Sequence, residues 1–191
     1  MDGAKYKITS GDSVSFETLK FYISGIELLE NGKGVWKEEN SIHLIDVSDP
    51  KSLCVRLNTL QQFSFTKIQF NLGIDSITNV SGAMGGDLDP TKGMYWTWQN
   101  GYINFKLEGK SNLCKTRNHE FQFHLGGYQF SNNSLQIISF PCTPQENIFI
   151  RFDLEKFIHL ADLSNENQVM SPGNNAVLLS KKAASSFSIS E

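Results

Sequence analysis

The chain has 191 residues, of which 39% are hydrophobic and 19% carry a charge. This length suits one domain with a sizeable core, and the hydrophobic fraction argues against wholesale disorder. The formal net charge is −3, with the two signs interspersed. A nucleic-acid-binding protein needs clustered basic residues, so that class is not indicated. No apolar run approaches the ~20 residues that span a bilayer, and the opening MDGAKYK holds no apolar signal segment.

The first part of the chain shows short extended segments separated by turn signals. Residues 5–9 begin the first one. Residues 19–36 predict two strands around the ENGKG turn at 30–34, because Asn and Gly tolerate a positive φ. Two further β runs follow at 41–47 and 65–74. In the 19–36 segment the side chains expected to face inward are those of Phe21, Ile23, Ile26 and Leu28.

Residues 75–93 interrupt this pattern with four glycines, a proline and three aspartates. No helical period runs through the segment, so it is predicted to be a long ordered loop. Loops of this length within compact domains are commonly functional.

Strict alternation resumes after the loop. The segment 102–109 places Ile103, Phe105 and Leu107 on one face, and its polar side chains, including Glu108, on the other. The segment 119–128 places its Phe and Leu side chains on one face and His124 on the opposite face.

The last part of the chain holds two more predicted strands and one helix. Residues 134–140 can return antiparallel to 119–125 as a hairpin, and 147–158 is a further strand. Residues 174–187 form the one convincing helix, because apolar residues recur there at helical spacing.

About eight short strands, turn signals between them and one late helix define the expected fold class. Strands do not alternate with helices, which disfavours a parallel doubly wound sheet. The prediction is an all-β protein: one domain over residues 1–191, an antiparallel β-sandwich with Greek-key connections, the long ordered loop 75–93 and one C-terminal helix.

The cysteine pattern leaves two possibilities open. The count of three is odd and no CxxC motif is present, which disfavours a zinc ribbon or a thioredoxin-type site. If 119–125 and 134–140 form a hairpin, Cys114 and Cys142 fall nearly opposite each other, within reach of a disulfide. The alternative is that all three thiols, including Cys54, are free.

Known catalytic patterns are missing from the sequence. It contains no GxSxG, no HExxH and no glycine-rich loop between a strand and a helix. Asp87 and Asp89 resemble part of a calcium loop, but the EF-hand spacing is absent, so capping and turn formation is the expected role of both. The chain is therefore predicted not to be an enzyme.

The stretch GMYWTWQNGY, residues 93–102, is the densest aromatic cluster in the chain. If it is extended, Met94, Trp96 and Trp98 project to the same face. Such a row can be a plain hydrophobic face, or it can wall a soft-metal site, because thioether and imidazole ligands suit copper. Spacing alone leaves both interpretations open.

Two of the four histidines are candidates for binding a metal. No histidine belongs to an HxH motif or an i, i+4 pair. His124 points away from its bulky apolar neighbours and is followed by Gly126 and Gly127, which allow a close approach. His43 similarly lies within a β run and points away from its aliphatic neighbours.

The strings FNLGIDSITNVSGAMGGDLDPTKGMYWTWQNGYINFKLEG and FQFHLGGY together resemble the methanobactin-associated periplasmic copper-binding protein family. LKFYISGIELLENG and SIHLIDVSDP are similar to its earlier strands. VMSPGNNAVLLSKKAASSF is similar to the C-terminal helix of the version found in Bacteroidetes envelope proteins. The resemblance covers nearly the whole chain, and GMYWTWQNGY with FHLGG is its specific part.

The resemblance implies an exported, copper-binding, non-catalytic protein of the periplasm or cell surface. Its signal would have been removed from this chain, and a lipid anchor could lie upstream. The implied ligands for copper, expected as Cu(I), are His124 and His43, with Met94 as an auxiliary ligand. Trp96 and Trp98 would wall the site, and either could be oxidised to kynurenine. The implied partners are a di-haem peroxidase-like modifying enzyme or an outer-membrane transporter.

The sequence departs from the family pattern at one point, because Trp98 occupies the position where a W-x-H histidine might stand. This departure keeps a second function open. Trp96, Trp98 and Tyr102 could instead form a metal-free aromatic platform that binds a peptide, a glycan or a partner protein.

Overall fold

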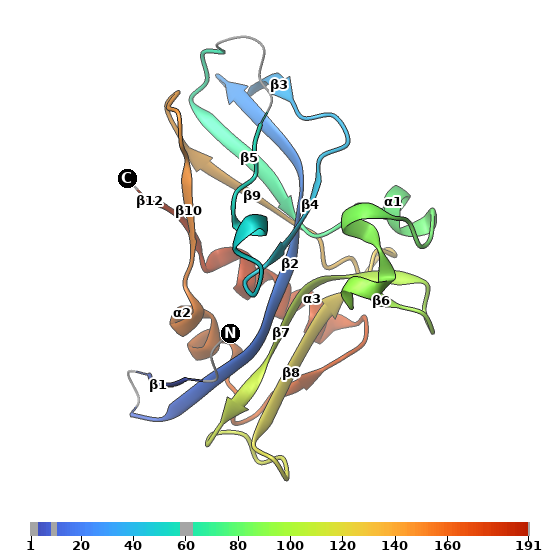
Figure 1. Ribbon diagram of the computed structural model, residues 1–191, viewed down its shortest axis with the longest axis vertical. Coiled ribbons are helices and arrows are strands. Elements are labelled where there is room, and N and C mark those ends of the chain that lie inside the picture. Colours follow the sequence, from blue (N-terminus) through green and yellow to red (C-terminus); the bar gives the residue numbers. More distant parts are fainter. Residues whose placement is uncertain (1–3, 9–10, 58–62, 191) are drawn as a thin grey trace.

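One long strand, β2 (Ser13–Glu30), runs through the molecule and carries the rest of the sheet (Figure 1). The computed structural model describes residues 4–8, 11–57 and 63–190, so Thr9 of the predicted first segment lies outside the described residues. The strand begins six residues before position 19, where the sequence pattern predicts its start.

The remaining elements are mostly short strands. In chain order they are β1 (Lys5–Lys7), β3 (Lys33–Lys37), β4 (Ile42–Asp46), β5 (Lys67–Leu72), β6 (Tyr95–Trp96), β7 (Gly101–Ser111), β8 (Glu120–Gly126), β9 (Gln136–Pro141), β10 (Phe149–Phe152), β11 (Gln168–Val169) and β12 (Phe187–Ser190). The helices are α1 (Ser76–Val80), α2 (Leu154–Ala161) and α3 (Asn174–Ser185), with 3₁₀ turns at Pro50–Leu53, Gly86–Leu88 and Pro90–Lys92.

The sheet divides along β2 into two halves. Phe21 pairs with residues of both β4 and β7, whereas Ile23 pairs with residues of both β4 and β5. A strand residue has one neighbouring strand on each side. Both β7 and β5 therefore lie on the side of β2 opposite β4, with β7 along the N-terminal part of β2 and β5 along its C-terminal part. The resulting order is β11-β8-β7-β2-β5-β9, and the sheet curls into the predicted sandwich-like all-β fold. One pair, β11 with β8, is parallel.

A β-bulge keeps the apolar side chains of β2 on one face. The register against β5 shifts between Ser24 and Glu27, and Gly25 adopts a positive φ of 60°. The extra residue compensates for the odd spacing between Ile23 and Ile26. All four side chains predicted to face inward in this segment therefore pack in the main core.

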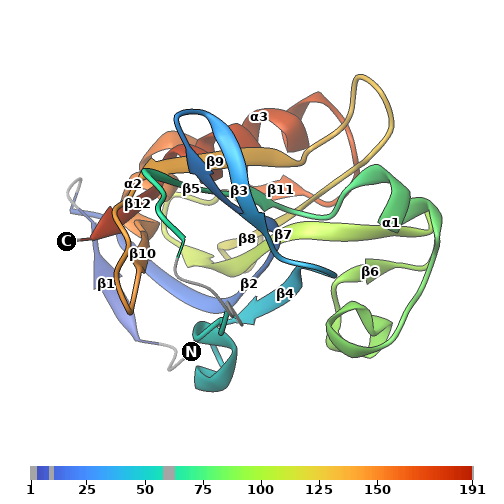
Figure 2. The ribbon, with the colours of Figure 1, turned by 90° about the horizontal axis from the view of Figure 1, so that it is seen from above.

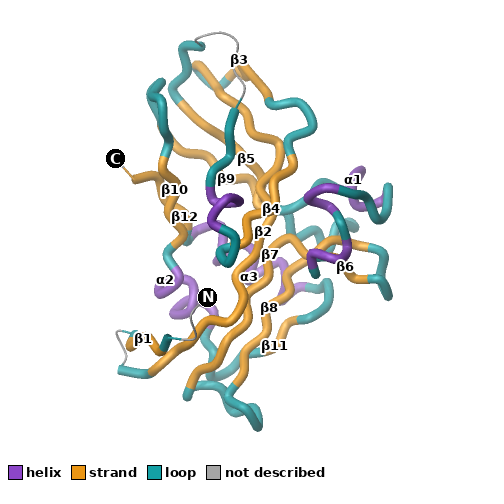
Figure 3. The backbone as a smooth tube through the Cα atoms, viewed as in Figure 1, coloured by secondary structure: helices purple, strands orange, loops and turns teal. Residues whose placement is uncertain are grey.

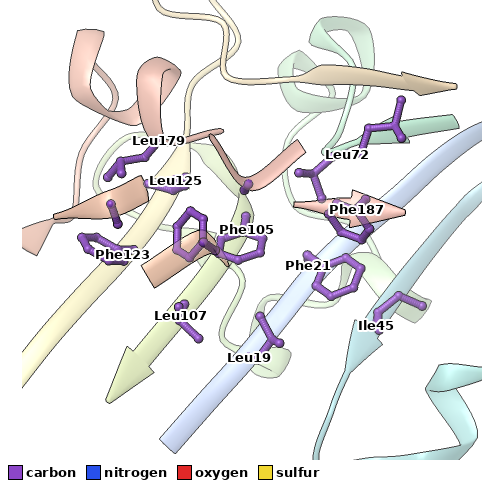
Figure 4. Close-up of a cluster of buried hydrophobic side chains, with 14 of the residues drawn as sticks. Leu19, Phe21, Ile45, Leu72, Phe105, Leu107, Phe123, Leu125, Leu179 and Phe187 are labelled. Carbon is purple, nitrogen blue, oxygen red and sulfur yellow. The ribbon is translucent and has the colours of Figure 1, made fainter. Parts of the chain in front are cut away.

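The main core lies inside the curl and is rich in phenylalanine (Figure 4). Helix α3 contacts both β8 and β9, so it bridges the two halves of the sheet, as seen from above in Figure 2. Its buried residues are Ala176, Leu179, Ser180 and Ala183. In the described part of the chain, no helix combines the length and the apolar character required to cross a bilayer.

The C-terminal region contains a helix where the sequence pattern predicts a strand. The predicted strand 147–158 ends at Phe152, and α2 follows because the Asp153 side chain accepts a hydrogen bond from the Lys156 backbone N–H. The buried side chains of α2, at Phe157, Ile158 and Ala161, follow helical spacing. The predicted helix 174–187 also ends earlier, at Ser185, and Phe187 begins β12.

The predicted hairpin and disulfide are wrong. β9 pairs with β5, whereas β8 pairs with β7 and β11. The Cys142 N–H donates to the carbonyl of Thr66, which lies beside the C-terminal end of β2. Cys114 follows β7, and the last residue of β7 pairs with Val14, near the N-terminal end of β2. Cys114 and Cys142 thus lie toward opposite ends of an 18-residue strand, far beyond the ~4.4–6.8 Å that a disulfide spans. Both thiols are free and buried, and Cys54 is free and exposed.

The predicted loop 75–93 is ordered but contains α1 and two 3₁₀ turns (Figure 3). Asp75 caps α1 by accepting hydrogen bonds from the Thr78 N–H and hydroxyl. A five-residue helix is too short to produce a visible apolar period, so the sequence pattern could not reveal it.

Candidate metal-binding site under the aromatic cluster

A second, smaller buried cluster lies on the face of the sheet opposite the main core. Tyr22 contributes to it because it alternates along β2 with Phe21 and Ile23, which face the main core. The loop 75–93 and β6 cover this cluster. Its buried members are Tyr22, Leu44, Ile74, Leu88, Met94, Trp96, Tyr102 and Ile103.

Asp87 connects the loop 75–93 to strands β2 and β4 through hydrogen bonds. Its Oδ2 accepts the Leu44 N–H at 3.0 Å, its Oδ1 pairs with Lys92 Nζ at 2.7 Å, and its carbonyl accepts the Tyr22 hydroxyl at 3.0 Å. Burial alone would raise the pKa of Asp87, but the hydrogen bonds from Lys92 and Leu44 lower it below the ordinary value. Asp89 caps the following turn by accepting the Thr91 N–H. Asp89 is therefore a capping residue, as the sequence indicated, whereas the side chain of Asp87 links the loop to β4 and Lys92 instead of capping a turn.

Met94 and Trp96 are both buried, at 0% and 7% exposure, whereas Trp98 is 65% exposed. The difference arises because β6 has only two residues and the chain turns after Trp96. The expected row of three is therefore correct for Met94 and Trp96 but wrong for Trp98. The rings of Trp96 and Trp98 remain neighbours, with centroids 5.7 Å apart.

The Trp96 ring lies on Gly126 of β8. A Cβ at Gly126 would be 2.6 Å from Trp96 Cζ3, so only glycine leaves room for the indole. His124 is two residues earlier on the same strand and thus on the same face, about 7 Å along the strand. The fold therefore places the imidazole of His124 next to the position on β8 where the buried indole of Trp96 packs.

His124 is buried and held by Glu108. Its Nε2 lies 2.7 Å from Glu108 Oε1, and Lys106 Nζ lies 3.6 Å from the same oxygen. Burial would raise the pKa of Glu108, but hydrogen bonds from His124 and Thr18 lower it, so this carboxylate is ionised and can only accept. The proton must then sit on Nε2, which leaves Nδ1 of the neutral ring as the free lone pair.

The charge state of His124 also suits a metal ligand. Burial lowers the pKa of the imidazole, although the hydrogen bond to Glu108 partly opposes this effect. Metals bind the neutral imidazole, so burial keeps His124 in the competent form to a lower pH than a free histidine.

The structure does not bring His43 and His124 together. His43 pairs with Ile23 of β2, which packs against the main core, whereas His124 lies on the opposite face of the sheet. Two strands, β2 and β7, separate β4 from β8, so the two backbones are about 14 Å apart across the sheet. His43 has its own carboxylate partner, because Nε2 lies 2.8 Å from Glu38 Oε2.

The remaining histidines lie elsewhere. His119 Nδ1 donates to the Cys114 carbonyl at 2.9 Å, and His159 is exposed on α2. Among residues 4–8, 11–57 and 63–190, no group of three or more His, Cys, Asp or Glu side chains is placed to hold a metal ion. A metal beside His124 would therefore have at most two ligands of those four residue types, and its remaining donors would be of other kinds.

The pairing of Glu108 with His124 is not predictable from the sequence alone. Alternation had placed Glu108 on the polar face of 102–109 and His124 on the polar face of 119–128. Only the β7–β8 register, in which Glu108 pairs with Gln122 and Lys106 with His124, makes them diagonal neighbours.

The stability of the metal-free protein is expected to depend on pH through His124. The pKa of His124 is lowered in the folded state. Below pH ~6.5 this side chain therefore binds a proton in the unfolded chain more readily than in the folded protein. Stability therefore falls as the pH drops below ~6.5. Urea unfolding between about pH 8 and pH 5, where most unfolded carboxyls stay ionised, should show a weaker fall for His124→Gln. An equal fall in both proteins would contradict the assignment.

Comparisons with known proteins agree with this architecture. A family model described as MbnP matches residues 2–171. Among solved structures, MbnP from Methylosinus trichosporium is similar, with a TM-score of 0.63 and 15% identity over 98% of this chain and 91% of that chain. At this identity the likeness concerns the fold alone. No curated protein sequence matches.

Proposed function

Because this chain belongs to the MbnP family, we propose that it is a non-catalytic copper-binding protein of the periplasm or cell surface. Its task would be the capture, storage or handover of copper. The proposal extends the family assignment to this chain's own residues, and the candidate ligand is His124.

The observation that carries the proposal is the pairing of His124 with Glu108. Metal-ligating histidines usually donate their second ring N–H to a carboxylate or carbonyl, which orients the ring and raises its basicity. Glu108 occupies that position at 2.7 Å, so His124 presents Nδ1 as the donor atom. A buried, neutral imidazole beside an indole fits Cu(I), which accepts soft ligands and a low coordination number.

Met94 is the proposed auxiliary ligand. Its side chain is buried in the same cluster as Trp96. Lys106 pairs with His124 across the strands and donates to the carbonyl of Gly93, so the residue before Met94 lies near the neighbour of His124. A thioether in this cluster would suit Cu(I). His43 cannot share an ion with His124, so it would bind copper only as a separate, weaker site next to Glu38.

Oxidation of a tryptophan to kynurenine belongs to the same proposal, with Trp98 as the more accessible ring and Trp96 as the buried one. The proposed oxidant is a di-haem peroxidase-like partner, and an outer-membrane transporter is the proposed partner for handover. Intact mass of protein from its native envelope, followed by peptide mapping of residues 93–102, tests whether either ring is modified.

The direct test is a competition titration of Cu(I) under reducing conditions. His124→Ala is expected to weaken binding by tenfold or more, because it removes the imidazole proposed as the ligand. Glu108→Gln should weaken it by about 10–100-fold, since a partner that orients a metal-binding histidine typically contributes that much. His159→Ala serves as the matched control, because His159 is exposed on α2, and it should bind as the parent does. Unchanged affinity in His124→Ala would refute the assignment.

The alternative function, a metal-free interaction domain, rests on Trp98 alone. Trp96 and Tyr102 are buried, so the three residues do not form one exposed platform. The exposure of Trp98 favours an interaction with another molecule at the β6–β7 turn. This alternative would be favoured if the parent protein bound no copper and Trp98→Ala no longer bound a partner that the parent binds.

A further inference from the structure

Four stretches of the chain contain no charged side chain. No Asp, Glu, Lys or Arg occurs in residues 76–86, 93–105, 121–145 or 167–180, although 19% of the whole chain is charged. These stretches include α1, the β6–β7 turn, the β8–β9 loop and the segment that leads into α3.

The four stretches meet at one end of the molecule. Ser76 Oγ donates to the Tyr128 carbonyl at 2.9 Å, which joins α1 to the β8–β9 loop. The Tyr102 N–H donates to Asn79 Oδ1 at 2.8 Å, which joins the start of β7 to α1. Gly127 faces Pro172, where an added Cβ would be 3.0 Å from the proline Cβ. Figures 1 and 2 show α1 and β6 at this end, which we name the neutral end.

Large apolar side chains project from the neutral end. Phe130 in the β8–β9 loop is 100% exposed, Ile77 and Val80 on α1 are 82% and 72% exposed, and Trp98 is 65% exposed. Ile77 and Val80 are three residues apart and so share one side of the short helix, away from the buried Asn79. Three separate segments thus direct apolar side chains outward from uncharged stretches of the chain. The charged side chains at their border include Asp75, which caps α1, and Lys106, whose Nζ donates to the Gly93 carbonyl.

We propose that the neutral end docks on the interface of a zwitterionic lipid bilayer. Binding to an anionic membrane would require clustered Lys or Arg, and the four stretches that form the neutral end contain neither. Inserting a charged side chain into the apolar layer is costly, so an inserting surface gains by lacking charge. Trp98 and Phe130 provide apolar surface for the interface, where aromatic rings are favoured, and the surrounding Asn, Gln and Ser side chains can hydrogen-bond to headgroups.

The shape of the surface separates this partner from a glycan or a peptide. A glycan or peptide usually occupies a groove or pocket. None of the four exposed side chains lines the cavities of about 130 and 360 Å³ in the described part of the chain. A fluid interface needs no groove, because separate tips can insert independently.

The test uses the full chain with vesicles of phosphatidylcholine alone. We expect the parent protein to float with the vesicles and its tryptophan emission to shift to the blue, with the shift absent in Trp98→Phe. The double variant Ile77→Ser/Phe130→Ser should partition at least tenfold more weakly, since each buried apolar side chain contributes about a factor of ten or more. Phe149→Ser, a matched change at a 65% exposed phenylalanine in β10, should partition as the parent does.

Three outcomes would overturn the proposal. The first is equal partitioning of the parent and the double variant. The second is binding only to vesicles that contain phosphatidylglycerol, abolished by salt. The third is no vesicle binding by the parent protein. In that case, a concentration-dependent dimer in sedimentation that the double variant does not form would point to self-association, and binding of a neutral glycan would point to a glycan as the partner. None of these readouts involves copper, so they are independent of the proposed metal site.

Discussion

Replacing Phe105 with alanine is expected to lower the free energy of unfolding by about 3–5 kcal/mol. Phe105 is 0% exposed in the centre of β7, and its ring centroid lies 5.4 Å from those of both Phe152 and Phe157 and 6.1 Å from that of Phe21. It therefore connects β2, β7, β10 and α2. Truncation would leave a cavity that surrounding rings, held in three different elements, cannot close.

Urea unfolding followed by circular dichroism measures this loss. Phe130→Ala is the matched control, because Phe130 is 100% exposed and its truncation should change the stability by less than about 0.5 kcal/mol. Similar losses in the two variants would mean that Phe105 does not hold the core together as described.

The second large effect is expected for Gly126→Ala. The new Cβ would lie 2.6 Å from both Trp96 Cζ3 and the Tyr102 carbonyl oxygen. The indole could shift, but the carbonyl belongs to the backbone of β7 and cannot easily move. We expect a loss of about 1–3 kcal/mol, as is usual for overpacking, and a displaced Trp96. Copper binding should weaken as well, if Trp96 walls the site beside His124.

Urea unfolding and tryptophan emission report the two parts of this prediction. Gly85→Ala is the matched control, because Gly85 has a φ of −95° and an added Cβ there meets nothing within 4 Å. It should leave stability and emission unchanged. If Gly126→Ala were as stable as the parent, with the same emission, the Trp96 ring would not be seated on β8 as described.

The strands were predictable where a local period of two was strong. In β7, Phe105 and Leu107 alternate with polar residues and both face the main core, as predicted. Ile103 was predicted on the same face but packs in the second cluster, because the register of β7 against β8 shifts between Ile103 and Phe105. The prediction failed for α2, because Phe149–Phe152 is a strand and its alternation of apolar and polar residues continues through Leu154 into the helix. Only Asp153, the capping residue, marks the boundary.

The candidate site was predictable in part. Alternation showed that His124 points away from the phenylalanines of β8, and the aromatic density drew attention to Trp96. The exposure of Trp98 was not predictable, because it depends on where β6 ends. Gly126 was evident in the sequence, but its contact with the Trp96 ring was not.

The sequence by itself determined which side chains share a face along each regular stretch of strand, because that property depends only on neighbouring φ and ψ angles. The bulges in β2 and β7, which change the faces on either side of them, were decided by the pairing of the strands. It also determined the uncharged stretches and the family resemblance. The tertiary structure alone decided which faces meet. The pairing of β7 with β8 joins Glu108 to His124, and the order β4-β2-β7-β8 keeps His43 away from both. The pairing of β9 with β5 separates Cys114 from Cys142. Strand register between distant segments arises from the packing of the whole core, which no local pattern encodes.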